Sequence, residues 1–423
     1  MRCGAGSMAR EMTADAPVSQ EERANRRNAV LAAFLGWTLD AFDFFILVMV
    51  LPAVATEFHR SIPDIALTLT ATLATRPVGA LIFGLLADRY GRRIPLMLDL
   101  IFYSLVEVLS GLAPTYGSFL ILRLIYGVGM GGEWGVGASL AMESIPAKSR
   151  GWISGLLQEG YASGYLLAAV VYYVVFPHWG WRPMFFIGGL PALLALFIRS
   201  KVKESEVWKE SRTDWSSYRR AIAKNWRLFV YLVVLMAGMN AISHGTQDLY
   251  PTFLRKHYQL GVHTVAIITV ISMVGAICGG LVFGFFSDRV GRRRAMVAAI
   301  IAGILLIPLW LLEPRVAIVA LGAFLMQFMV QGAWGIIPAH INELSPDQLR
   351  GFFPGFAYQL GVLCASAVAY VESIFAERFS YTQSLGYSML ILFTFTALVV
   401  ALGPEKKGFS FGSPKKIPAE APQ

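Results

Sequence analysis

Two copies of one decapeptide occur in this chain: Gly84-Leu-Leu-Ala-Asp88-Arg89-Tyr-Gly91-Arg92-Arg93 and, 200 residues later, Gly284-Phe-Phe-Ser-Asp288-Arg289-Val-Gly291-Arg292-Arg293. The same offset pairs Gly-Glu-Trp-Gly at 132–135 with Gly-Ala-Trp-Gly at 332–335, without a gap. Repeats of solenoids and propellers are only about 20 to 50 residues long. The chain is therefore predicted to consist of two copies of one large unit.

The composition indicates a membrane protein. Hydrophobic residues make up 56% of the 423 residues, charged residues only 15%, and the mean hydropathy is +0.57, whereas soluble domains are about 25% charged. Apolar stretches of about 20 residues, long enough to cross a bilayer, recur between short polar breaks. We predict twelve spans in two groups of six: 29–53, 65–87, 94–113, 118–143, 151–175 and 183–200, then 226–251, 262–286, 295–313, 315–339, 352–373 and 384–403. A duplicated half in an apolar chain is typical of transporters.

The polar breaks divide the chain into five predicted regions: a leader 1–28, a first half 29–200, a central loop 201–225, a second half 226–403 and a tail 404–423. The first span is too long, and its leader too polar, for a cleaved signal peptide, so we expect it to stay in the membrane.

Lys and Arg gather on one side of the predicted spans, and cytoplasmic loops retain such residues. They precede the first span, follow the second and fourth, and fill the central loop and the tail. Both termini and the central loop are therefore expected to be cytoplasmic. This bias explains the net charge of +9 without a nucleic-acid partner. Because no Asn-x-Ser/Thr acceptor occurs and the exterior loops are short, a bacterial cytoplasmic (inner) membrane is the simplest location.

The repeated decapeptide combines a glycine turn with charges that can pair neighbouring helices at one membrane face. We interpret it as a latch, although plain cytoplasmic anchoring by Arg is an alternative. Glu and Arg residues that recur at the ends of the fourth and tenth spans are assigned to the same latch. Its predicted members are Gly84, Asp88, Arg89, Gly91, Arg92, Arg93, Glu143 and Arg150, with Asp288, Arg289, Gly291, Arg292, Arg293, Glu343 and Arg350.

The chain resembles the major facilitator superfamily over essentially its whole length. The loop motif stands in both halves, and Arg123-x-x-x-Gly127-x-Gly129-x-Gly131 in the fourth span matches that superfamily's second signature. The resemblance implies an all-α fold of twelve transmembrane helices that alternates access to a central site. The Gly-Pro pair of antiporters is missing from the fifth span, which favours symport. We further expect Arg123 near the membrane edge, where an interfacial anchor is one interpretation of its role. The glycine run 127–137 is expected to permit close helix packing.

Polar groups are most dense in the seventh span, which reads Asn240-Ala-Ile-Ser243-His244-Gly-Thr246-Gln247-Asp248-Leu-Tyr-Pro251-Thr252. Polar groups inside a membrane are costly and therefore usually functional. Helical spacing places positions 240, 244, 247, 248 and 251 on one face. Gly245 and Pro251 are expected to loosen the helix nearby.

This segment resembles the signature of the fungal lactate/pyruvate:proton symporters, Asn-x-x-Ser/Thr-His-x-Ser/Thr-Gln-Asp-x-x-x-Thr, at every specified position. The first span carries Asp40-Ala-Phe-Asp43, similar to an Asp-x-x-Asp of the bacterial sialate:proton symporters. These resemblances imply a proton-coupled carrier for small carboxylates. In the repeat register, Asp40 lies opposite Asn240 and Phe44 opposite His244, so the two spans are expected to face a shared site.

An anionic substrate needs a positive partner, and Arg76 lies in the middle of the second span, where the register partner is Ala276. A guanidinium can hold a carboxylate with two parallel hydrogen bonds. The predicted substrate-binding residues are Arg76, Asn240, Ser243, His244 and Gln247. The alternative for Arg76 is a permanent structural pair with Asp40, Asp43 or Glu107.

Proton coupling needs a carboxyl that gains and loses its proton as water access alternates. The predicted coupling residues are Asp43, Asp248, Asp40 and Glu133, and Glu159 is a further candidate.

These observations predict a proton-coupled symporter that imports small monocarboxylates such as lactate and pyruvate. Sialic acid or aromatic acid:proton symport, or a carboxylate sensor that does not transport, remain alternatives. An enzyme is not expected, because no nucleophile–base arrangement or metal spacing appears. We expect no metal and no cofactor; the expected partners are the carboxylate, protons and the lipid bilayer, and the expected functional unit is a monomer.

Overall fold

The computed structural model describes residues 20–91, 93–144, 150–204, 223–312, 315–345 and 353–405, and the regular secondary structure in these ranges is helical. The first group of helices is α2 (Gln20–Glu57), α3 (Ile62–Tyr90), α4 (Arg93–Gly111), α5 (Tyr116–Ser144), α6 (Arg150–Trp179), α7 (Arg182–Ile187) and α8 (Pro191–Lys201). The second group is α11 (Trp226–Gln247), α12 (Tyr250–Lys256), α13 (Val262–Val290), α14 (Arg292–Leu311), α15 (Val316–Leu344), α16 (Phe353–Ala365), α17 (Val368–Arg378) and α18 (Tyr381–Leu402).

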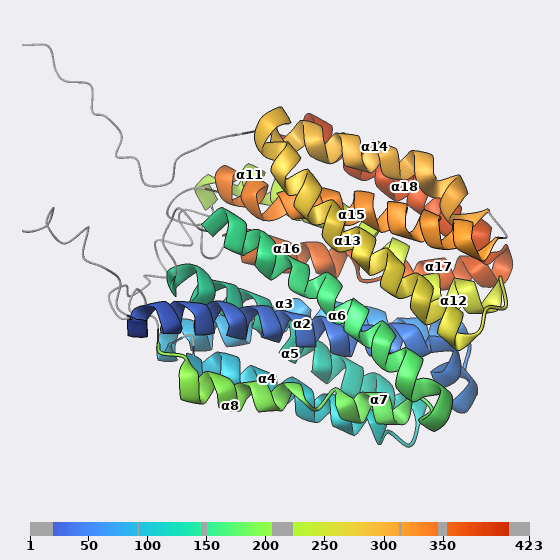
Figure 1. Ribbon diagram of the computed structural model, residues 1–423, viewed down its shortest axis with the longest axis horizontal. Coiled ribbons are helices and arrows are strands. Elements are labelled where there is room, and N and C mark those ends of the chain that lie inside the picture. Colours follow the sequence, from blue (N-terminus) through green and yellow to red (C-terminus); the bar gives the residue numbers. More distant parts are fainter. Residues whose placement is uncertain are drawn as a thin grey trace, which may run out of the picture.

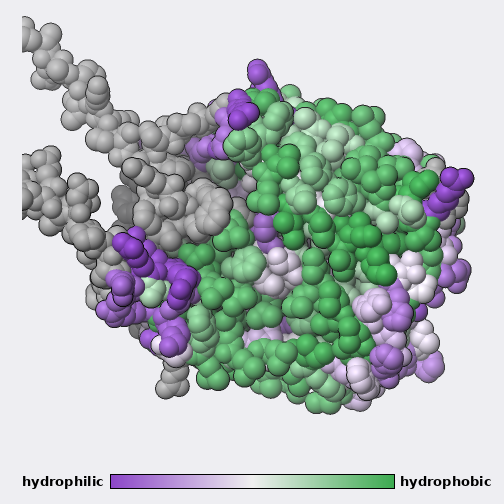
Figure 2. Space-filling model, in the orientation of Figure 1, coloured by the Kyte–Doolittle hydropathy of each residue, from purple (hydrophilic) through white to green (hydrophobic). Residues whose placement is uncertain are grey.

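The helices confirm the predicted all-α membrane fold. Ten segments in the described part are long and apolar enough to cross a bilayer. Helix α5, with 29 residues, lies at the predicted fourth span, and α7 and α8 together lie at the sixth. Figure 2 shows a broad hydrophobic surface between two hydrophilic ends. This is the surface that a bilayer covers.

Three predicted spans are interrupted. The sixth breaks between α7 and α8, where Gly188 and Gly189 precede a proline at the first position of α8. The seventh breaks between Gln247 and Tyr250, close to the predicted weak points Gly245 and Pro251. The eleventh breaks between Ala365 and Val368. The break in the seventh span lies inside its polar segment, so the helix is interrupted among its polar side chains.

Figure 1 shows α2 to α8 gathered in the lower part of the molecule and α11 to α18 in the upper part. Within the lower group, α3 and α5 approach so closely that a Cβ on Gly79 would meet the Val128 carbonyl, and one on Gly127 would meet that of Thr72. Small residues allow such approaches between membrane helices. The predicted role of the glycine run in close packing is therefore confirmed.

The two groups meet along α6 and α13, and along α3 with α16 and α17. At the end of the bundle where Glu57 and Ile62 lie, which we call the far end, the Arg255 guanidinium donates to the Tyr172 hydroxyl at 3.2 Å. The rings of Tyr173 and His263 lie 4.4 Å apart nearby. These contacts hold the two groups together at the far end.

Candidate functional site

Arg76 lies in the middle of α3 and is 1% exposed. Its guanidinium carbon lies 5.7 Å from the ring centroids of Trp37 and Tyr358, which come from the two different helix groups. The Tyr358 hydroxyl also accepts a hydrogen bond from Arg76. Cation–π contacts stabilise a buried guanidinium without neutralising its charge. Arg76 therefore carries a positive charge at the boundary between the two groups.

One edge of this guanidinium is unoccupied. Within the described residues, Nε and Nη2 of Arg76 have no hydrogen-bond partner. These two nitrogens form the side-on edge of a guanidinium, from which two parallel N–H groups bind a carboxylate. Glu107, one of the partners considered for a structural pair, instead binds Arg123 at 2.6 Å. The edge that recognises carboxylates is thus left available.

Several carboxyl groups of the first group are buried without partners. Asp40 and Asp43 on α2 and Glu133 on α5 are each 0% exposed, and in the described part of the chain none of their oxygens is hydrogen-bonded. Asp99 on α4 is 1% exposed, and neither of its carboxyl oxygens is hydrogen-bonded within the described residues. The sequence reasoning missed this residue. Its position inside a predicted apolar span was the available signal.

The interpretation of Arg123 as an interfacial anchor is wrong, because its side chain is buried inside the protein. Its side chain is 1% exposed, binds Glu107 and Ser110, and packs over the Tyr126 ring at 4.5 Å. A guanidinium far from water needs such a counter-charge. Glu107 from α4 neutralises Arg123 inside the protein, so a position near one end of the span did not place this side chain at the lipid surface.

His244 and Asp248 form a pair at the end of α11. Their Nδ1 and Oδ2 atoms are 3.0 Å apart, and both side chains are buried. The His244 ring also packs edge-to-face on Phe44, with centroids 5.6 Å apart. Phe44 is the register partner of His244 in the repeat. The expected meeting of the first and seventh spans therefore occurs at these two residues.

Two polar side chains of the motif bond to glutamines of α15. Gln247 Nε2 donates to Gln327 Oε1 at 2.8 Å, and Ser243 Oγ accepts from Gln331 Nε2 at 3.1 Å. Asn240 instead donates to the Met236 carbonyl of its own helix at 2.8 Å. The sequence reasoning missed both α15 glutamines. In the 200-residue repeat, Gln327 and Gln331 correspond to Gly127 and Gly131. This replacement of glycine by a polar side chain within a membrane span was the sequence signal for both glutamines.

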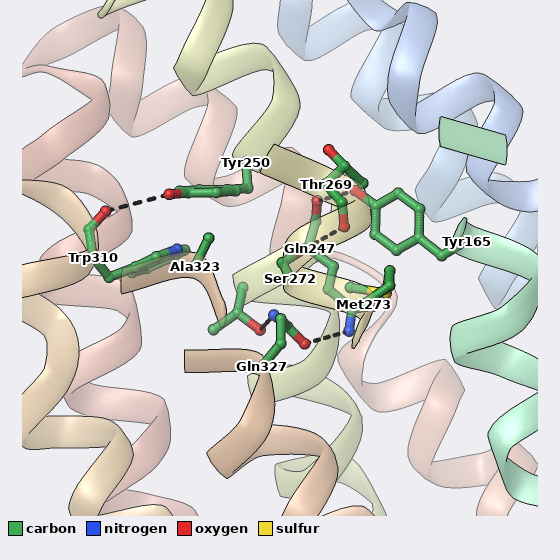
Figure 3. A pocket seen from close by; sticks show the side chains of 10 residues that line it. Tyr165, Gln247, Tyr250, Thr269, Ser272, Met273, Trp310, Ala323 and Gln327 are labelled. Atoms are coloured by element: carbon green, nitrogen blue, oxygen red, sulfur yellow. Dashed lines mark hydrogen bonds between the residues drawn. The ribbon is translucent and has the colours of Figure 1, made fainter. Parts of the chain in front are cut away.

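A small cavity of about 10 Å³ lies beside Gln247. Figure 3 shows Tyr165 of α6 and side chains of the second group around it. The Tyr165 hydroxyl donates to the Gln247 carbonyl at 3.2 Å, and Gln247 Oε1 has no partner among the described residues. The cavity is lined by Tyr165, Thr246, Gln247, Tyr250, Thr269, Ser272, Met273, Trp310, Ala323 and Gln327. Its volume corresponds to about one water molecule, with hydroxyl and amide groups around it.

Glu159 on α6 is half-buried and lies at the boundary between the two helix groups, where α6 packs against α13. A Cβ on Gly280 of α13 would collide with its carboxyl. Glu159 therefore contacts the second group away from His244 and Asp248.

The two glycine turns of the repeated decapeptide have the same backbone conformation, with φ +97° at Gly91 and +111° at Gly291. Such φ values favour glycine. Arg292 binds Asp288 at 2.7 Å and Glu343 at 3.2 Å, which fastens α14 to the ends of α13 and α15. Arg293 donates to the Gly403 carbonyl at 2.9 Å.

Two glutamates that the sequence reasoning did not assign to the latch complete these turns. The Glu204 carboxylate accepts from the Arg93 backbone N–H at 3.2 Å, and Glu405 does the same for Arg293 at 3.4 Å. Arg289 packs over the Phe285 ring. Gly84 lies inside α3 with open space around it. The other predicted members lie outside the described residues or have side chains that do: Asp88, Arg89, Arg92, Glu143, Arg150 and Arg350.

Known proteins of related sequence are transporters of small molecules. The chain is 32% identical to the sialic acid transporter NanX of Escherichia coli, over 89% of this chain and 93% of that protein. It is 30% identical to a carboxylic acid transporter protein homolog of Saccharomyces cerevisiae, over 92% of this chain and 69% of that protein. It is also 30% identical to a probable 4-methylmuconolactone transporter of Cupriavidus pinatubonensis, over 92% of this chain and 93% of that protein.

The fold and the family model agree with these relatives. A crystal structure of a D-xylose-proton symporter superposes with a TM-score of 0.73, at 18% identity, over 91% of this chain and all of that one. Residues 228–405 match the family model described as sugar (and other) transporter. Residues 33–247, about half of the chain, match the model of the Major Facilitator Superfamily. The chain is therefore a multi-pass membrane protein that belongs to the major facilitator superfamily.

Proposed function

We propose that this protein is a proton-coupled symporter that imports small monocarboxylates of the lactate and pyruvate type. Its halves, 29–200 and 226–403, alternate access to the site between them, and a monomer suffices. In this proposal the protein lies in a bacterial inner membrane with both termini in the cytoplasm. The latch residues hold the helix ends on the cytoplasmic side.

The observation that carries the proposal is the unoccupied edge of Arg76. A buried cation that binds two aromatic rings, but leaves its Nε and Nη2 atoms without partners, is suited to an anion that arrives from outside. A carboxylate satisfies both nitrogens at once. His244, Asn240, Ser243 and Gln247 on α11 bind the rest of the substrate in this proposal.

The surplus of buried carboxyls supports proton coupling. Asp40 and Glu133 lie close enough to Arg76 for its charge to act on them, and Asp43 lies near Glu107 and Arg123, but none of the three carboxyls has a hydrogen-bond partner among the described residues. Arg76 and Arg123 cannot together neutralise Asp40, Asp43, Glu133 and Glu107, and an uncompensated buried charge is costly. Protons on some of these groups remove that cost, and their release drives the cycle. Asp248, paired with His244, has the same role in the second half.

The names of the relatives support the substrate class. A carboxylic acid, sialic acid and a muconolactone are small organic acids or their close derivatives.

Purified protein in liposomes should take up lactate and pyruvate against their gradients when the outside is acidic. The reason is that a proton gradient supplies the free energy for symport. Uptake of labelled lactate, pyruvate, acetate, sialate and benzoate is compared with and without a protonophore. Uptake of sialate alone, or uptake that ignores the protonophore, would contradict the proposal. Binding without uptake would favour the sensor.

A further inference from the structure

Glu372 is a buried carboxyl that none of the roles above uses. It lies on α17 and is 1% exposed. Its carbonyl oxygen accepts a hydrogen bond from Ser384 Oγ at 2.6 Å, which fixes α17 on α18. A Cβ on Gly245 of α11 would lie 3.1 Å from Glu372 Oε1. The carboxyl therefore lies against the helical turn that joins His244 to Asp248.

The charges around Glu372 do not balance. Neither of its oxygens has a partner within the described ranges, and Asp248 is near enough to repel it. His244 is the one side chain on this part of α11 that can become cationic, and Asp248 already binds it. The other ionisable groups of the middle and far parts of α3, α17 and α18 are Asp64, Arg76, Tyr370, Glu377, Arg378, Tyr381 and Tyr387. Of these, Arg76 contacts Trp37 and Tyr358, and Arg378 is exposed.

One histidine therefore faces two carboxyls. A protonated His244 and an ionised Asp248 have no net charge together, so an ionised Glu372 would be an uncompensated charge in a dry site. Glu372 avoids this cost when it carries a proton. Two interacting carboxyls of this kind release their protons in separate steps that belong to the pair.

We infer that Glu372 is a second proton-binding carboxyl of the transport cycle, placed in the second half beside the His244–Asp248 pair. Its O–H bond stays intact while α11 and α17 are packed, and the proton passes to water when the cycle lets water reach the turn. This inference rests on the proposed proton-coupled transport. In the repeat register, Tyr172 stands opposite Glu372 and Val48 opposite Asp248, so the first half holds no copy of this site.

Infrared spectroscopy of purified protein at neutral pH tests proton binding without any substrate. The carbonyl band of a protonated carboxyl should be present in the wild type and weaker in Glu372→Gln. Glu377→Gln is the matched control, because it changes an exposed glutamate of the same helix and should leave that band intact. An unchanged band in Glu372→Gln would overturn the inference.

Uptake of radiolabelled lactate into proteoliposomes tests the coupling role. Glu372→Gln should exchange lactate across the membrane but raise the internal concentration only to the external one, whereas Glu377→Gln should accumulate lactate normally. Accumulation by Glu372→Gln at the wild-type level would overturn the inference. If the wild type transports no lactate, the proposed substrate fails, and the infrared band still decides whether Glu372 holds a proton.

If Glu372→Gln does not fold, Glu372→Asp tests the same inference. It keeps a carboxyl that is one methylene shorter, so the infrared band and the accumulation should remain while the pH profile of uptake shifts. A pH profile identical to that of the wild type would overturn the inference.

Discussion

Lysine in place of Arg76 is expected to raise the half-saturation concentration of lactate uptake by about 10- to 100-fold. Hydrogen bonds to charged groups contribute about 1.5–3 kcal/mol, and an ammonium group cannot reproduce the parallel pair donated by Nε and Nη2. The positive charge is kept, so folding in the membrane should be preserved. Initial uptake rates over a range of lactate concentrations measure the effect.

Arg123→Lys is the matched control for this variant. Arg123 is equally buried in the same half, but it is already bonded to Glu107 and Ser110. Its replacement should lower the amount of folded protein without changing the half-saturation concentration of the molecules that fold. Normal affinity in Arg76→Lys would reduce Arg76 to a structural residue.

Asparagine in place of Asp43 or Asp248 is expected to abolish accumulation while lactate exchange persists. An amide mimics a carboxyl that never loses its proton, so the carrier can still change conformation with substrate bound but can no longer release a proton. The internal lactate concentration should then rise only to the external one. Proteoliposomes with an inward proton gradient measure accumulation, and counterflow measures exchange.

Gln247→Ala is the control for this second prediction. It removes a neutral group bonded to Gln327, so affinity should fall by about five- to tenfold, as expected for roughly 1 kcal/mol per hydrogen bond. Accumulation should remain. If Asp43→Asn and Asp248→Asn both accumulate lactate at the wild-type level, coupling depends on another carboxyl, and Glu133 is the next candidate.

The membrane fold was predictable from the sequence because bilayer thickness dictates how long an apolar segment must be. The repeat register also placed Phe44 opposite His244, and the two rings are in contact. The close approach of α3 and α5 followed from the glycine run, since small residues allow backbones to meet. In these cases the pattern in the sequence reflects a single physical requirement, such as the thickness of the bilayer or the space between two backbones.

The charge partners were not predictable, because they depend on how separate helices are oriented. Arg123 was interpreted as an interfacial anchor, but α4 brings Glu107 to it inside the protein. Gln327, Asp99 and Glu372 were missed because each is an isolated polar residue in an otherwise apolar span, without the dense polar pattern of the seventh span. A search for every charged or amide side chain within an apolar span would have found them.

The most direct test of the central claim is the pH inside proteoliposomes when lactate is added outside. If lactate enters together with protons through the Arg76 site, the interior acidifies at a rate that saturates with lactate concentration. Arg76→Lys should then need a higher lactate concentration for the same rate. Lactate entry without a change of internal pH beyond that of protein-free liposomes would contradict proton-coupled carboxylate symport.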